Sequence, residues 1–289
     1  MKSAVQLLVI DPQNDFCDLP ASHLGIDPSF GATLAPALPV TGAHQDMLRL
    51  AGLIRLAGAG IDDITITLDS HQRMDIAHPT FWRKADGSAV MPFTTISASQ
   101  VRAGEFQPCS SDALPRTLAY LDELEARGRY TLMVWPVHCE IGSWGHNVHA
   151  DLRAAYNQWE EQWLRTVSKV TKGENPWTEH YSAVQAEVPD TEDPHTQLNS
   201  ALIAKLDRAD MLLIAGEASS HCVRATTEHI VANLPSGRPE RVVLLTDCMS
   251  PVTGFEAQHD AFLSEMQGLG VRLSTAAEVL PLIQASIAR

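Results

Sequence analysis

The regular alternation of short apolar runs with longer helical patterns constrains the fold of this chain most. Six runs are apolar almost throughout, as strands covered on both faces are: residues 4–10, 64–68, 130–135, 211–215, 241–246 and 271–274. Helical patterns separate or follow them, at residues 45–57, 114–127, 149–167, 198–207, 222–233, 256–269 and 276–288. Strand followed by helix, repeated, predicts an α/β fold with a parallel sheet between two layers of helices.

Two long segments interrupt this alternation. Residues 17–41 and 83–112 are rich in Pro, Gly and Ser and show no strong periodicity. We interpret them as long loop insertions within one domain covering residues 1–289, rather than as linkers between domains. Long loops in compact domains are often functional, so both insertions are candidates for shaping a binding site.

Composition excludes several classes of partner. The chain has 289 residues and a net charge of −14, which argues against binding to nucleic acids or anionic membranes. No apolar run is long enough to cross a bilayer, and the N-terminus lacks the pattern of a signal peptide. The five cysteines lie far apart without a CxxC pair, which indicates reduced thiols. We therefore expect a soluble, cytoplasmic protein.

Polar side chains follow several of the predicted strands. Asp11 comes directly after the first apolar run, Asp69 and His71 after the second, and His138 after the third. Cys222 begins a helical pattern shortly after residues 211–215. Ligands of open parallel sheets bind beyond the carboxyl ends of the strands, so these groups are expected to meet at one edge.

Each of these groups also has a plain structural explanation. Asp11, in "IDPQNDF", fits a type I turn, but a carboxylate there could also exchange a proton with a thiol. Lys172, before a glycine, could be solvated surface or the counter-charge of a thiolate. Cys222 could be a small buried residue, or a nucleophile favoured by the positive end of the helix dipole. The turn "GEASS" before it could present the N–H groups of Ala218 and Cys222 as an oxyanion hole.

A possible metal site lies in "TLDSHQRMDIAHPTFW" and "WPVHC". One carboxylate, Asp69, and two or three imidazoles, from His71, His78 and His138, suit zinc, iron(II) or manganese with open positions left. The alternative is a polar loop in which the histidines are incidental, since the chain contains twelve.

Taken in order, five motifs resemble those of one known family. "LLVIDPQNDF", "TLDSHQ", "WPVHCEIGSWGHNVH", "KG" followed by "YSA", and "GEASSHCVRAT" resemble the nicotinamidase branch of the isochorismatase-like cysteine hydrolases. The resemblance extends from Asp11 to about Asp247. It implies a three-layer α/β/α sandwich with a six-stranded parallel sheet, and hydrolysis of a small (hetero)aromatic amide such as nicotinamide through a thioester. It also implies one divalent transition metal, with zinc ahead of iron or manganese, and we expect a homo-oligomer.

The resemblance assigns roles to particular residues. It implies a catalytic triad of Asp11, Lys172 and Cys222, with Ala218 and Cys222 N–H groups in the oxyanion hole and a cis peptide at Glu217–Ala218. The other implied residues contact the metal or the substrate: Asp69, His71, His138 and, as a fourth ligand, His78 for the metal, and Phe16, Trp135 and Gln13 for the substrate, the two aromatic side chains enclosing its ring.

The chain also departs from the family pattern. It is longer than usual, with the excess at residues 17–41, 83–112 and 146–170, and His146 stands where the family carries a small residue. Because these segments border the expected pocket, substrate choice is the property they would change. Alternative functions are a related cysteine hydrolase acting on a carbamoyl or other amide, a vinyl-ether hydrolase without a nucleophilic cysteine, a hydrolase using metal-activated water, and a non-catalytic metal- or ligand-binding protein.

Overall fold

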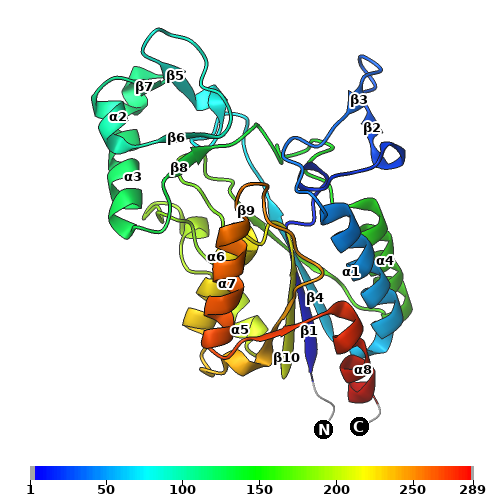
Figure 1. Cartoon of the computed structure of the whole chain (residues 1–289). Coiled ribbons are helices and arrows are strands. Elements are labelled where there is room, and N and C mark those ends of the chain that lie inside the picture. The colour runs from blue at the N-terminus through cyan, green and yellow to red at the C-terminus, as the bar shows by residue number, and fades with distance from the viewer. Residues whose placement is uncertain (1–3, 288–289) are drawn as a thin grey trace.

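The structure, a computed structural model, describes residues 4–287 of the chain (Figure 1). Its centre is a six-stranded sheet in the order β12-β11-β10-β1-β4-β9, in which every neighbouring pair is parallel. The strands are β1 (Val5–Ile10), β4 (Asp63–Asp69), β9 (Ser168–Lys172), β10 (Met211–Gly216), β11 (Val242–Leu245) and β12 (Arg272–Ser274). The chain begins near the middle of the sheet and fills one side and then the other, so the order of the strands reverses next to β1.

Two layers of helices cover the sheet. Figure 1 shows α1 (Ala43–Ala57), α4 (Ala150–Trp163) and α8 (Ala276–Ile287) on one side, and α5 (Ser200–Leu206), α6 (Cys222–Asn233) and α7 (Glu256–Gly268) on the other. All six residues of β1 are buried, as its unbroken apolar sequence predicts for a strand between two helical layers. The predicted three-layer α/β/α sandwich is therefore confirmed.

One predicted strand does not belong to this sheet. Residues 130–135 contain β8 (Leu132–Val134), which pairs antiparallel with β6 (Thr94–Ile96) outside the central sheet. The sixth strand of the sheet is β9, which the sequence analysis did not predict. Four of its five residues, SKVTK, are polar, and alternate side chains are exposed because β9 lies at an edge of the sheet.

The segment 83–112 is more ordered than a loop insertion. With its neighbours it forms β5 (Trp82–Lys84), β6, α2 (Ala98–Arg102) and β7 (Phe106–Pro108), and β5 pairs with β7. These elements pack with α3 (Leu114–Arg127) and β8 around a second hydrophobic cluster, seen at the upper left of Figure 1. The segment 17–41 carries the short 3₁₀ helix η2 (Ala21–His23) and the short hairpin of β2 (Gly25–Ile26) and β3 (Thr33–Leu34). The third expected insertion, residues 146–170, contains α4 and the start of β9.

The end of β10 lies unusually close to the end of β1. Gly216 pairs with Ile10 and has φ +117°, a conformation that side chains rarely adopt. A Cβ atom on Gly216 would lie 2.0 Å from the carbonyl oxygen of Ile10, so only glycine fits. This close approach brings the turn before α6 next to the residue that follows β1.

No helix between residues 4 and 287 is both long and apolar enough to cross a membrane.

Candidate active site

The carboxyl ends of four adjacent strands bring the predicted catalytic residues together. Asp11 follows β1, Lys172 ends β9, and Cys222 begins α6 after β10. Asp69 ends β4 and pairs in register with Lys172. All four side chains are buried, so the interpretation of Lys172 as solvated surface is wrong.

Lys172 is the centre of this group. Its Nζ lies 2.9 Å from Asp11 Oδ2, 2.8 Å from Asp69 Oδ1 and 3.6 Å from Cys222 Sγ. The other oxygen of Asp11 accepts a hydrogen bond from the hydroxyl of Thr67 on β4. One ammonium thus touches both carboxylates and the thiol.

Burial and charge set the protonation of these groups. Burial disfavours the charged ammonium of Lys172, but the carboxylates of Asp11 and Asp69 outweigh it and hold the pKa of Lys172 well above its usual value. Burial raises the pKa of the Cys222 thiol well above its usual value, although Lys172 opposes the shift. Burial also raises the pKa of Asp11. The resting state therefore contains a charged lysine and a neutral thiol; the helix start alone does not make Cys222 a thiolate.

The turn before α6 exposes two backbone donors. The peptide bond Glu217–Ala218 is cis, as the motif resemblance predicts. The carbonyl of Ala218 accepts hydrogen bonds from the N–H groups of His221 and Val223, which closes the turn onto the helix. The N–H groups of Ala218 and Cys222 donate to no other residue within 4–287, so both remain available for a ligand oxygen.

Next to Lys172 lies a cluster of potential metal ligands. His71, His78 and His138 are buried, and one ring nitrogen of each lies within 4.8 Å of those of the other two. Asp69 Oδ2 lies 3.1 Å from His71 Nε2 and 3.2 Å from His138 Nε2. Asp69 therefore connects the cluster to Lys172, which contacts its other oxygen.

The surroundings of these histidines fit a divalent transition metal. His71 Nδ1 lies 3.0 Å from Asp75 Oδ2, and His138 Nδ1 lies 2.8 Å from the carbonyl oxygen of Pro136. Metal-binding histidines usually donate their second N–H to such acceptors, which leaves Nε2 of both rings for an ion. Burial lowers the pKa of His78 to about 2, so this ring is neutral and one of its nitrogens has a lone pair available. Despite burial, Asp69 and Asp75 raise the pKa of His71, so a cation here competes with a proton.

A narrow pocket opens between Cys222 and the histidine cluster. It is lined by Phe16, Leu38, Asp69, Trp135, His138, Glu179, Tyr181, Ala218, His221, Cys222 and Val252. Phe16 and Trp135, the residues expected to enclose a substrate ring, both line it. Trp135 Nε1 donates a hydrogen bond of 3.0 Å to the hydroxyl of Tyr181. Leu38 comes from the insertion 17–41, which therefore reaches the pocket. Sequence reasoning did not predict Leu38, Glu179, Tyr181, His221 or Val252 as site residues. For Tyr181 a signal existed, in the "YSA" that follows Lys172.

Gln13, which the resemblance implies as a substrate contact, does not line this pocket. Its side chain is fully buried. The amide nitrogen donates to the backbone carbonyls of Asp69 and His146, and the amide oxygen accepts from the N–H of Asp69 at 2.7 Å. Because the amide is occupied on both sides, Gln13 positions the end of β4, including Asp69, and has no free group for a ligand. His146 also lies outside the pocket lining, with its Nε2 2.9 Å from the hydroxyl of Ser70.

Comparison with known proteins identifies the fold. Neither the protein-family models nor the curated protein sequences contain a match to this chain. Among solved structures, a nicotinamidase/pyrazinamidase from Acinetobacter baumanii is 18% identical with a TM-score of 0.62, over 96% of this chain and 98% of that one. The pyrazinamidase of Pyrococcus horikoshii in complex with zinc is 19% identical with a TM-score of 0.52, over 94% and 98%. An isochorismatase-like hydrolase from Alkaliphilus metalliredigens is 15% identical with a TM-score of 0.53, over 97% and 99%.

At these identities the comparisons establish the fold and not the activity. The chain has the α/β fold of the isochorismatase-like hydrolases. More particularly, it is similar over nearly its whole length to nicotinamidases and pyrazinamidases, and the resemblance seen in the motifs is confirmed at the level of the fold.

Proposed function

We propose that this protein is a cysteine amidohydrolase that converts a small heteroaromatic carboxamide, with nicotinamide as the first choice, to the acid and ammonia. The observation that carries this proposal is the contact of Lys172 with both Asp11 and Cys222, because Cys222 also lines a pocket. The similarity to solved nicotinamidases and pyrazinamidases supports the same conclusion independently of the contacts.

In the first step Asp11 takes the proton of the Cys222 thiol. Transfer to Asp11 replaces a carboxylate by a thiolate beside the Lys172 ammonium, so the positive charge remains compensated. Sγ then attacks the carboxamide carbon. The N–H groups of Ala218 and Cys222 donate hydrogen bonds to the oxygen as it gains negative charge.

In the second step the C–N bond breaks. Asp11 returns its proton to the departing nitrogen, ammonia leaves, and the acyl group stays on Sγ as a thioester. Water then gives a proton to Asp11 and attacks the thioester carbon. The C–S bond breaks, the acid is released, and the proton on Asp11 restores the Cys222 thiol.

Four residues would hold one divalent transition metal, for which zinc is our first choice: Asp69, His71, His78 and His138. The solved pyrazinamidase with this fold that contains zinc supports this choice. When bound, the ion would supply a Lewis acid for the lone pair of a substrate ring nitrogen. Asp69 would link the metal to the catalytic residues, because one of its oxygens faces the histidines and the other contacts Lys172.

Phe16 and Trp135 favour a flat aromatic substrate. Both line the pocket that holds Cys222, and aromatic side chains pack well against a planar ring.

Cytoplasmic location and a homo-oligomeric state stay predictions.

The test is ammonia release, with kcat/KM compared for nicotinamide, pyrazinamide, benzamide and an aliphatic amide. We expect benzamide to react about a hundredfold more slowly than nicotinamide, since it has the same shape but lacks the ring nitrogen. Cys222→Ala should be inactive, whereas Cys109→Ala, at an exposed cysteine outside the pocket, should keep full activity. Equal rates for benzamide and nicotinamide would overturn the choice of substrate, and an active Cys222→Ala would overturn the proposed chemistry.

A further inference from the structure

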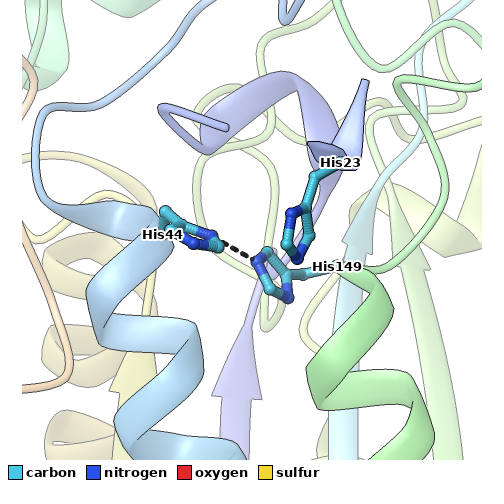
Figure 2. A group of neighbouring side chains, drawn as sticks. All are labelled: His23, His44 and His149. Carbon is cyan, nitrogen blue, oxygen red and sulfur yellow. Dashed lines mark hydrogen bonds between the residues drawn. The ribbon is translucent and has the colours of Figure 1, made fainter. Parts of the chain in front are cut away.

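A second histidine cluster lies outside the proposed active-site pocket. His23 ends η2 (Ala21–His23) in the insertion 17–41, His44 is in the first turn of α1, and His149 immediately precedes α4. Figure 2 shows the three side chains converging from these separate elements, with His44 and His149 joined by a hydrogen bond. None of the three lines the pocket that contains Cys222.

The three imidazoles are close enough to share one ion. His44 Nδ1 lies 2.9 Å from His149 Nε2, and one nitrogen of each ring lies within 4.8 Å of those of the other two. The ring centroid of His23 lies 4.8 Å from that of His44 and 5.6 Å from that of His149. A tetrahedral zinc ion holds nitrogens at about 2.0–2.1 Å, so its ligand nitrogens are roughly 3.3 Å apart. The rings therefore need only small movements, and the His23 side chain, 23% exposed, has room to make them.

The environment of the rings matches that of metal ligands. His149 is fully buried, yet its Nδ1 has no hydrogen-bond partner within the described part of the chain. Such an unpaired buried nitrogen is unfavourable unless something else satisfies it. His23 Nε2 lies 2.8 Å from Asp151 Oδ2, the carboxylate–histidine pairing that commonly orients a ligating ring. Burial, together with the neighbouring His44, lowers the pKa of His149 to about 4, so the ring is neutral at neutral pH.

We propose that His23, His44 and His149 form a second metal site, which binds a divalent transition ion of the zinc type, with Asp151 orienting His23. Three imidazoles are a ligand set that suits zinc and its neighbours and does not suit magnesium or calcium. The His44–His149 hydrogen bond leaves the buried Nδ1 of His149 unpaired.

An ion at this site would fasten the insertion 17–41 to α1 and α4. Leu38 of the same insertion lines the proposed active-site pocket. The N–H of His149 donates a 2.8 Å hydrogen bond to the carbonyl oxygen of Pro12, the residue after Asp11. The site therefore has a structural role: it holds the rim of the pocket and the loop after β1 in place.

Zinc stoichiometry and affinity test this proposal without relying on activity. After removal of metal with a chelator, the full-length wild-type protein should bind two Zn²⁺ ions per chain in equilibrium dialysis with elemental analysis. His23→Gln should bind one. A variant with His71→Ala and His138→Ala, in which the other cluster is removed, should still bind one ion. In that background, His23→Gln should weaken zinc binding about 100-fold or more, because it removes a metal ligand and not merely a residue that orients a ligand.

Two controls make the outcome decisive. His195→Gln changes an exposed histidine outside both clusters and should leave the stoichiometry unchanged. His44→Gln, on a different element from His23, should reproduce the loss of one ion. The proposal is overturned if His23→Gln and His44→Gln both keep the zinc stoichiometry of the wild-type protein. That comparison uses the intact chain, so it holds even if the variant without the other cluster does not fold.

Discussion

Replacing Lys172 by methionine tests whether its ammonium compensates the buried carboxylates of Asp11 and Asp69. The ammonium is 2% exposed and lies 2.9 Å from Asp11 Oδ2 and 2.8 Å from Asp69 Oδ1. Methionine fills a similar volume without a charge. The substitution thus leaves two buried carboxylates facing each other with no cation between them.

The cost follows from that arrangement. Removing one partner of a buried ion pair typically costs about 3–5 kcal/mol, because the remaining charge stays buried and uncompensated. Asp11 and Asp69 both lose their lysine contact here, although Asp69 keeps its contact with His71, so we expect about 5 kcal/mol at pH 8. Burial already raises the pKa of Asp11, and loss of Lys172 raises it further. A raised pKa in the folded state means that stability is present at low pH and lost as pH rises, so the deficit should shrink towards pH 5.

Urea unfolding at pH 5 and pH 8 measures this difference. Lys169→Met is the matched control, since Lys169 lies on the same strand, is exposed, and should cost less than about 1 kcal/mol. Adding Asp11→Asn to Lys172→Met removes one of the two unpaired charges and should recover part of the loss at pH 8. If Lys172→Met cost no more than Lys169→Met at pH 8, the ammonium would not be compensating the carboxylates and the reasoning would fail.

Three further perturbations have defined outcomes. Asp75→Asn should weaken zinc binding at the cluster of His71, His78 and His138 by about 10–100-fold, because it removes the acceptor that orients the His71 ring. Calorimetric titration measures this affinity, and an unchanged value would contradict the role of Asp75. Burial raises the pKa of Glu187 to about 7, so the wild-type protein loses stability as pH rises from about 4.5 through 7. Glu187→Gln lacks this loss and should be more stable than wild type at pH 8 by up to about 3 kcal/mol, and no more stable at pH 4, in thermal unfolding. Gly216→Ala should destabilise the fold by about 3 kcal/mol or more in urea unfolding, because its Cβ would lie 2.0 Å from the Ile10 carbonyl oxygen, whereas Gly52→Ala, in a helix with open space around it, should be neutral or stabilising.

The sequence predicted the layers of the fold because the four inner strands of the sheet, β11, β10, β1 and β4, are mostly buried and largely apolar. It could not identify β9, an edge strand whose mostly polar sequence, SKVTK, resembles that of a solvated loop. It also predicted residues 130–135 as a strand of the central sheet. These residues belong to the second hydrophobic cluster instead, and an apolar strand there has the same composition as a strand of the central sheet. Strand pairing depends on contacts between distant segments, which periodicity does not contain.

For the candidate site, the sequence identified the groups that follow the strands but not those that support them. Asp75 contacts His71 through a bend of the chain that no motif specifies. Gln13 stands in the first motif, yet its amide is used by the backbone of Asp69 and His146, which only the packed structure reveals. The second histidine cluster brings His149 to His44, 105 positions away in the chain, and no spacing pattern connects them.

The covalent intermediate tests the central claim most directly. Wild-type enzyme turning over nicotinamide is quenched in acid, digested, and its five cysteine-containing segments are compared by mass spectrometry. Our account predicts a nicotinoyl group on the peptide that contains Cys222, present also in Cys109→Ala and lost in Cys222→Ala together with nicotinate formation. Nicotinate produced by Cys222→Ala at the wild-type rate, with no acyl group found on Cys222 of the wild-type enzyme, would contradict it.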